Sequence, residues 1–182
     1  MSTIAPVDPA RAVPESRQLL DAVQAKLGMT PNLFKVMAHS PKVLGAYLGF
    51  SEALGGGKLD AKLRERIALA VAEKNSCGYC LSAHVAIGKM VGLNEGEIDQ
   101  ARDGRAADSR ASAALAFANQ LVTSRGAVPA ADVQAVRAAG FGEAEILEVI
   151  ATVAINILTN YVNLVAQTDI DFPKVALRGR AA

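Results

Sequence analysis

The sequence predicts an all-α fold in a single domain. A chain of 182 residues is long enough for one compact core and short for two. Proline and glycine residues divide the chain into segments of helical length, and capping residues stand before several of these segments. No segment alternates apolar and polar residues between turn signals, so we expect no strand. We therefore predict one helical domain over residues 1–182, with flexible tails at 1–13 and 174–182.

The first half of the chain is expected to hold five helices. Each begins at a proline or at a residue able to cap a helix, and most end at a glycine. The first four are expected from Pro14 to just before Gly28, from Pro31 to about Ala38, from Pro41 to Leu54, and from Asp60 to near Asn75. The fifth is expected to follow Ser76, which would be its N-cap, and to end at Val91.

Four more helices are expected at about 95–103, 109–124, 130–139 and 143–167, because glycines and a proline separate these apolar-periodic segments. The last is apolar enough to resemble a membrane span, but polar residues recur in it every three or four positions. We expect a helix buried nearly all round, whose polar stripe faces partners or a pocket, with interface hydrogen bonding favoured over catalysis. The stripe comprises Glu148, Thr152, Asn156, Asn160 and Asn163.

A shift of 83 residues aligns parts of the chain with one another, which would fit a degenerate internal repeat. Amphipathic helices match partly at some offset by chance, so a true duplication and a coincidence stay equally open. The aligned pairs are Leu63 with Ile146, Glu65 with Glu148, Ile67 with Ile150, Ala68 with Ala151, Cys77 with Asn160, Cys80 with Asn163, and His84 with Gln167.

Composition and charge exclude some classes of function. The formal net charge is +1, and no basic patch interleaved with aromatic residues is present, so we expect no nucleic-acid partner. The first residues show neither the basic nor the apolar region of a secretory signal, and we expect a cytoplasmic protein without membrane association. Because 51% of the residues are hydrophobic, some apolar surface is expected to close a homo-oligomer.

Both cysteines of the chain lie in Cys77-Gly-Tyr-Cys80, and His84 follows four residues later. In the cytoplasm such a pair is more often catalytic, redox-active or metal-binding than structural. With Ser76 as the cap, Cys77 would occupy the first helical position, where free N–H groups and the helix dipole favour a thiolate. His84 lies one turn beyond Cys80 and could take its proton. The motif predicts a redox-active dithiol, and the dipole and the imidazole favour different cysteines.

Glu65 can join this site only if the chain reverses direction. On one straight helix it would lie about 18 Å from Cys77. If the chain turns back near 75–76, Glu65 and His84 come level, which predicts a proton relay in the order Glu65, His84, Cys80. Whether the relay closes within one chain or across a subunit boundary stays open. Without the relay, Glu65 would be a solvated residue on a basic helix face.

The spacing Glu65-x11-Cys77-x2-Cys80-x3-His84 resembles the signature of AhpD-like alkylhydroperoxidases in the carboxymuconolactone decarboxylase superfamily. Residues 27–34, residues 40–44 and the segment from Asn156 to Pro173 are also similar to peroxidase-related members, so the resemblance covers about residues 25 to 173.

The resemblance implies an all-helical trimer or hexamer that reduces organic hydroperoxides. It implies that peroxide attacks Cys80, that Cys77 resolves the product, and that His84 and Glu65 relay protons. Some members carry histidine where this chain has Tyr79, which implies a shorter relay or a different rate. Decarboxylase members lack the dithiol, so its presence counts against that activity.

We predict a thiol-dependent peroxidase with no bound cofactor and no metal, reset by an external dithiol or redox protein, with Cys77 as the more exposed sulfur. The alternative function is a dithiol–disulfide adaptor that passes electrons to a peroxiredoxin-type partner. A non-redox metal or interaction module is a third. Two structural alternatives remain: a pair of buried free cysteines, and a zinc site formed by the cysteines, His84 and His39. Without such a site, His39 is predicted to be a helix-end residue that satisfies nearby carbonyls. Leu81 excludes haem attachment, and the helix before Cys77 excludes a thioredoxin fold.

Overall fold

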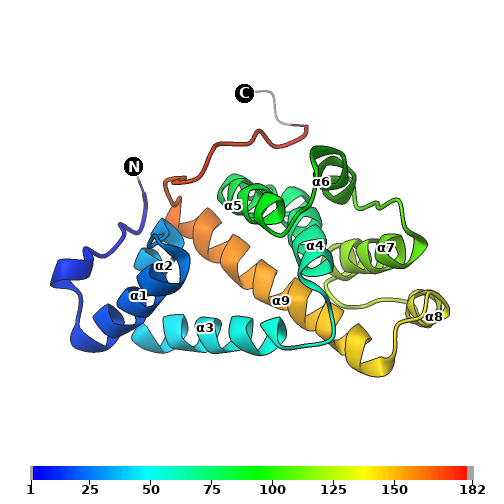
Figure 1. Cartoon of the computed structure of the whole chain (residues 1–182), viewed down its shortest axis with the longest axis horizontal. Coiled ribbons are helices and arrows are strands. Elements are labelled where there is room, and N and C mark those ends of the chain that lie inside the picture. The colour runs from blue at the N-terminus through cyan, green and yellow to red at the C-terminus, as the bar shows by residue number, and fades with distance from the viewer. Residues whose placement is uncertain (1, 180–182) are drawn as a thin grey trace.

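The computed structural model of the chain describes residues 2–179 and is helical throughout that range, without strands (Figure 1). The predicted all-α class is confirmed. A short 3-10 turn, η1 (Pro9–Arg11), precedes the α-helices. These are α1 (Pro14–Leu27), α2 (Asn32–Met37), α3 (Pro41–Gly55), α4 (Ala61–Lys74), α5 (Gly78–Met90), α6 (Glu95–Arg102), α7 (Ser109–Ser124), α8 (Ala130–Ala138) and α9 (Glu143–Ala166).

The predicted helix boundaries hold to within a residue or two, and the signals that predicted them act as expected. Gly28 ends α1 in the left-handed conformation, with φ 73°. The Ser40 hydroxyl accepts the Val43 N–H at the start of α3, and the Asp60 carboxylate accepts the Leu63 N–H at the start of α4.

The start of α5 differs from the prediction, because Ser76 does not cap it. Ser76 has φ 55° and belongs to the end of α4, where its N–H bonds Glu73 O and the Cys77 N–H bonds Ala72 O. This pair of bonds is a Schellman motif, which normally places glycine at the position Ser76 occupies. Cys77 is therefore the N-cap of α5, and its sulfur accepts the Cys80 N–H at 3.3 Å. The tight reversal leaves no residue free to be a separate cap.

The core lies around α4, which packs against α5, α6, α7 and α9. In Figure 1, α9 runs diagonally below the α4–α5 pair, and α3 runs below α9, on the side away from that pair. The α4 side chains Ile67, Leu69 and Val71 are completely buried, as are Leu81 of α5 and Val149 of α9. Because α4 is apolar on nearly all sides in its second half, helices can cover it all round, and this fixes the position of the dithiol hairpin.

Both end segments are held against the helices where the structure describes them. Thr3 N–H bonds Ala166 O at 2.7 Å, and Val7 N–H bonds Lys35 O at 3.1 Å. The residues after α9, 167–179, cross the start of α5 and are called the C-terminal strap below; Val175 N–H donates to Ser82 Oγ at 3.1 Å. These contacts tie both segments to the helices, while the flexibility expected of residues 1–13 and 174–182 stays a prediction, and residues 1 and 180–182 lie outside the described range.

Helix α9 has its polar stripe turned inward, toward the pocket that the prediction allowed, but within this chain the helix is not buried on all sides. Thr152, Asn156, Asn160 and Asn163 are buried, whereas Leu147, Tyr161 and Val165 are 65%, 61% and 66% exposed. The inward stripe is possible because its side chains find partners within the protein. Among the described helices, α9 alone is long and apolar enough to cross a membrane by length and composition, and half of its apolar window is buried inside the molecule.

The 83-residue shift does not produce a structural repeat. The reversal at Ser76 would fall at Thr159, which lies inside the continuous helix α9. The aligned segments are therefore a helix hairpin and a single straight helix. The similarity is limited to the pattern of residues that α4 shares with the first half of α9.

Candidate redox-active site

Cys77 and Cys80 form a disulfide at the start of α5, with their Cα atoms 5.3 Å apart. Their exposed fractions are 1% and 3%, so the prediction that Cys77 is the more exposed sulfur is wrong. The C-terminal strap is the physical reason, because Ile170 and Leu177 lie against Gly78 and cover this end of the helix. The two sulfurs are within bonding reach of each other, and neither is open to bulk solvent.

Glu65 and His84 meet as the reversal between α4 and α5 predicts. Glu65 Oε2 lies 2.8 Å from His84 Nδ1, and both side chains are mostly buried. This contact closes within one chain, whereas the further step from His84 to Cys80 stays a prediction. A carboxylate accepts only, so Nδ1 carries the proton in this contact and Nε2 is left to act as a base.

A cavity of about 230 Å³ lies beside the dithiol and brings Cys80 and His84 to one surface. Cys77 is not among the residues that line it. Its walls come from the end of α1, the segment between α1 and α2, and from α2, α3, α5, α9 and the strap, and they are mostly apolar and aromatic. The lining includes Leu27, Met29, Leu33, Phe34, Tyr47, Ile87, Met90, Thr159, Asn163 and Phe172.

Tyr79 joins three distant segments around the dithiol. Its hydroxyl donates to Asp171 Oδ1 at 2.8 Å and accepts the Leu33 N–H at 3.1 Å, and its ring meets Phe172 edge to face. The other carboxylate oxygen of Asp171 accepts the Asn32 N–H at 2.8 Å. Burial raises the pKa of the Tyr79 phenol well above its usual range, so it remains a neutral donor at any physiological pH. Tyr79 thus fastens the strap to α5 and forms part of the cavity wall.

Asn163 of α9 also reaches the dithiol, which sequence reasoning missed. Its Nδ2 lies 3.3 Å from Cys80 Sγ. One turn earlier, Asn160 Oδ1 accepts from Asn75 Nδ2 at 2.8 Å, at the α4–α5 reversal. The sequence favoured interface hydrogen bonding over catalysis for this stripe, because the packing of α9 against α5 is a long-range contact that the sequence does not show. The available signal was the stripe itself, since asparagines on an apolar helix need buried partners.

His39 lies outside the site. Its Nε2 bonds Ala5 O at 2.8 Å, as expected for a residue at the end of a helix. Within residues 2–179, no group of three or more His, Cys, Asp or Glu side chains is placed to hold a metal ion. The proposed zinc ligands are instead divided between the disulfide, the Glu65–His84 contact and the Ala5 carbonyl.

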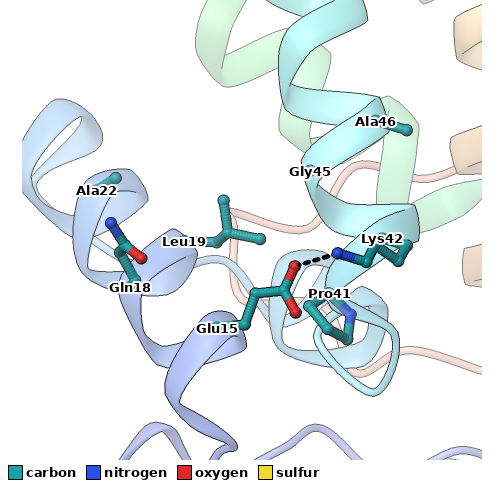
Figure 2. A pocket seen from close by; sticks show the side chains of 8 residues that line it. All are labelled: Glu15, Gln18, Leu19, Ala22, Pro41, Lys42, Gly45 and Ala46. Carbon is teal, nitrogen blue, oxygen red and sulfur yellow. Dashed lines mark hydrogen bonds and ion pairs between the residues drawn. The ribbon is translucent and has the colours of Figure 1, made fainter.

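A second hollow, of about 470 Å³, lies between α1 and α3 (Figure 2). Its only ion pair in Figure 2 joins Lys42 and Glu15 at 2.7 Å, and both side chains are largely exposed. Exposed pairs of this kind contribute little energy and imply no chemistry. The hollow has no thiol or imidazole in its walls, so the dithiol cavity is the better candidate site.

Comparison with known proteins gives matches over the site and over the whole fold. The model of the carboxymuconolactone decarboxylase family matches residues 41–123, which include Glu65, both cysteines and His84. An uncharacterized protein of Haemophilus influenzae is 53% identical over 45 residues. That alignment covers 24% of this chain and 40% of the relative, so it extends to less than half of the relative's length.

Solved structures match nearly the entire chain. The alkylhydroperoxidase AhpD core of a peroxidase-related protein from Ralstonia eutropha JMP134 superposes with a TM-score of 0.84 and 28% identity, over 93% of this chain and 92% of that one. A peroxidase-related protein from Silicibacter sp. TM1040 gives 0.79 and 25%, over 98% and 96%. The debrominase Bmp8 gives 0.79 and 22%, over 93% and 92%, a likeness of fold alone.

Proposed function

This chain belongs to the AhpD-like carboxymuconolactone decarboxylase superfamily, and we propose that it is a thiol-dependent peroxidase that reduces organic hydroperoxides. One observation carries the proposal: Cys80 and His84 line the same apolar cavity, and Glu65 holds His84 from behind. A thiol, a base and room for a hydrocarbon chain are the parts that this reaction needs.

His84 Nε2 takes the proton of Cys80, and the Glu65 carboxylate stabilises the imidazolium that forms. The Cys80 thiolate then attacks the distal peroxide oxygen, so that an S–O bond forms and the O–O bond breaks. The leaving alkoxide takes the proton from His84 and departs as an alcohol, while Cys80 becomes a sulfenic acid. Cys77 condenses with it, releasing water and giving the disulfide, which an external dithiol reduces.

Glu65 also lines a hollow of about 670 Å³ between α1, α3 and α4, and neither cysteine is among its lining residues. Tyr47 lies at the walls of both this hollow and the dithiol cavity; burial, and then the negative charge of Glu65, raises its pKa to about 12. In the proposed mechanism, this hollow lets the relay exchange protons with solvent without opening the dithiol cavity.

The experiment is stopped-flow oxidation of the reduced protein by tert-butyl hydroperoxide, compared with oxidation by a peroxiredoxin disulfide. We expect fast oxidation by the hydroperoxide, because a small apolar molecule fits the cavity, and slow oxidation by the protein disulfide, because both sulfurs are covered. The reverse order would favour the adaptor function and contradict the proposal.

Cysteine variants assign the roles. Cys77→Ser should consume about one hydroperoxide per site and stop as a sulfenic acid on Cys80, which dimedone traps. Cys80→Ser should consume almost none. A dimedone adduct on Cys77 in Cys80→Ser, with Cys77→Ser inert, would reverse the two roles and show that the helix end controls reactivity.

We further infer that the protein forms a cytoplasmic homo-oligomer through the exposed apolar face of α9. This face is continuous along the helix, and an apolar stripe of that length on a monomer usually marks an interface. Its most exposed members are Leu147, Leu158, Tyr161, Leu164 and Val165.

A further inference from the structure

Asn163 makes a contact with the reacting sulfur that the mechanism above does not use. Its side chain is buried, with 4% exposed, and its Nδ2 lies 3.3 Å from Cys80 Sγ. A disulfide sulfur carries no hydrogen and can only accept, so the amide nitrogen, not the oxygen, must face it. The donor already points at the atom that becomes a thiolate when the bond is reduced, and a donor bonds a thiolate more strongly than a neutral sulfur.

The other amide atom of Asn163 has no partner among the described residues. Oδ1 is fully buried and accepts no hydrogen bond, although the side chain lines the cavity together with Cys80 and His84. Buried polar atoms are nearly always paired, so an unpaired acceptor at a cavity wall indicates a ligand with a donor group. A hydroperoxide carries one O–H, on the oxygen that the sulfur attacks.

Another asparagine on the same helix shows what a purely structural role looks like. Asn156 Nδ2 bonds the Thr152 carbonyl within α9, and Asn156 does not line the dithiol cavity. It is nearly as buried as Asn163 and lies about two turns away. Asn156 therefore serves as a matched control for the loss of a buried amide from α9.

We propose that Asn163 is a catalytic residue of this site, whose Nδ2–H stabilises the Cys80 thiolate and whose Oδ1 accepts the hydroperoxide O–H. The second half of the proposal rests on the proposed function. The two amide atoms share one carbon, so both can face a single oxygen approaching a single sulfur. The amide neither gains nor loses a proton: the S–O bond forms, the O–O bond breaks, the alkoxide takes the proton of His84, and the distal oxygen keeps its own.

The first measurement needs no peroxide. In a Cys77→Ser background, the thiolate fraction of Cys80 is followed against pH by absorbance near 240 nm and by the rate of iodoacetamide alkylation. We expect Asn163→Ala to leave roughly tenfold less thiolate at neutral pH, because a hydrogen bond to the charged sulfur is lost. Asn163→Asp, of the same shape, should leave less still, since a carboxylate repels the thiolate. Asn156→Ala should follow the parent profile.

The second measurement is the rate constant for tert-butyl hydroperoxide in the same variants. For Asn163→Ala, the rate constant should fall by a larger factor than the thiolate fraction does. The remaining loss, at least severalfold, measures the Oδ1 contact. A pH profile unchanged in both Asn163 variants, or shifted equally by Asn156→Ala, would overturn the thiolate role. A rate loss equal to the thiolate loss would overturn the substrate role.

The two proposals can fail separately. If the parent protein does not reduce the hydroperoxide, the proposed function and the Oδ1 role are both wrong, while the alkylation profile still decides the thiolate role. Circular dichroism checks that the variants are folded. If Asn163→Ala is unfolded, Asn163→Leu, which is close in size and lacks both polar atoms, carries both tests.

Discussion

The α4–α5 hairpin and helix α9 begin with the same pattern of residues and end as different structures. Under the 83-residue shift, Glu65 of α4 corresponds to Glu148 of α9. In the hairpin the chain reverses at Ser76, and Glu65 meets His84 at 2.8 Å. In α9 the chain continues, and Glu148 instead accepts the N–H groups of Lys58 and Leu59. The comparison shows that the backbone reversal is what brings Glu65 level with His84, and that α9 has neither this reversal nor the cysteines and the histidine of the hairpin.

The two regions also differ in which side faces outward. The hairpin is covered by α6, α7, α9 and the strap, so most of its apolar residues are buried, with Met90 at the exposed end of α5 as an exception. Helix α9 turns its polar stripe toward the hairpin and leaves an apolar face exposed. Each region therefore supplies what the other lacks: the hairpin holds the thiols, and α9 brings amide groups to them.

The largest effect is expected from removing the charge of Glu65. Glu65→Gln keeps the size of the side chain but loses the carboxylate that stabilises the His84 imidazolium, so hydroperoxide reduction at pH 7 should slow by roughly 10²-fold. Because the thiol then needs a higher pH to ionise, raising the pH should restore part of the rate. Stopped-flow kinetics across pH measures both effects.

Glu148→Gln is the matched control for that variant. It should lower the free energy of unfolding by about 1 kcal/mol, because a charged acceptor is lost from two N–H groups, and leave the rate unchanged. Equal rates for Glu65→Gln and the parent would show that the Glu65 carboxylate has no part in the reaction, and that Glu65 and Glu148 do not differ in function.

The next effect concerns the exposed face of α9. Leu158→Glu combined with Tyr161→Glu places two charges in the middle of the inferred interface, which should raise the dissociation constant of the oligomer by at least tenfold. Light scattering across micromolar concentrations gives the mass. Met90→Glu, at the exposed end of α5, should not change it. A parent protein that is monomeric throughout would contradict the inferred interface.

The smallest effect tests the backbone difference directly, with one substitution at both matched positions. Ser76→Gly should stabilise the protein by roughly 0.5–1 kcal/mol, because glycine adopts the left-handed conformation without steric cost. Thr159→Gly should destabilise it by about 1 kcal/mol or more, because Thr159 is helical and buried. Urea denaturation measures both changes in the free energy of unfolding. Changes of the same sign would contradict the difference in backbone conformation between Ser76 and Thr159.

Much of the fold could be predicted because its signals are local. Proline, glycine and capping residues fixed the helix boundaries, and the spacing of Glu65 and His84 around residues 75–76 was enough to place them level. Three features were predicted wrongly, each for a physical reason. Ser76 was read as a cap, since the left-handed conformation of a serine leaves no sequence signal. The strap that buries Cys77 and the asparagine that reaches Cys80, Asn163, both depend on long-range packing, which periodicity does not encode.

The placement of the tyrosines has a practical consequence. The chain has three tyrosines and no tryptophan, so the near-ultraviolet spectrum belongs largely to these rings. Tyr79 stands between the two cysteines, Tyr47 lies at the cavity wall, and Tyr161 is on the exposed face of α9. The three tyrosines therefore report on different regions: the dithiol, the wall of the cavity beside it, and the exposed face of α9. Replacing the tyrosines one at a time by phenylalanine would assign the near-ultraviolet signal of each region without an attached dye.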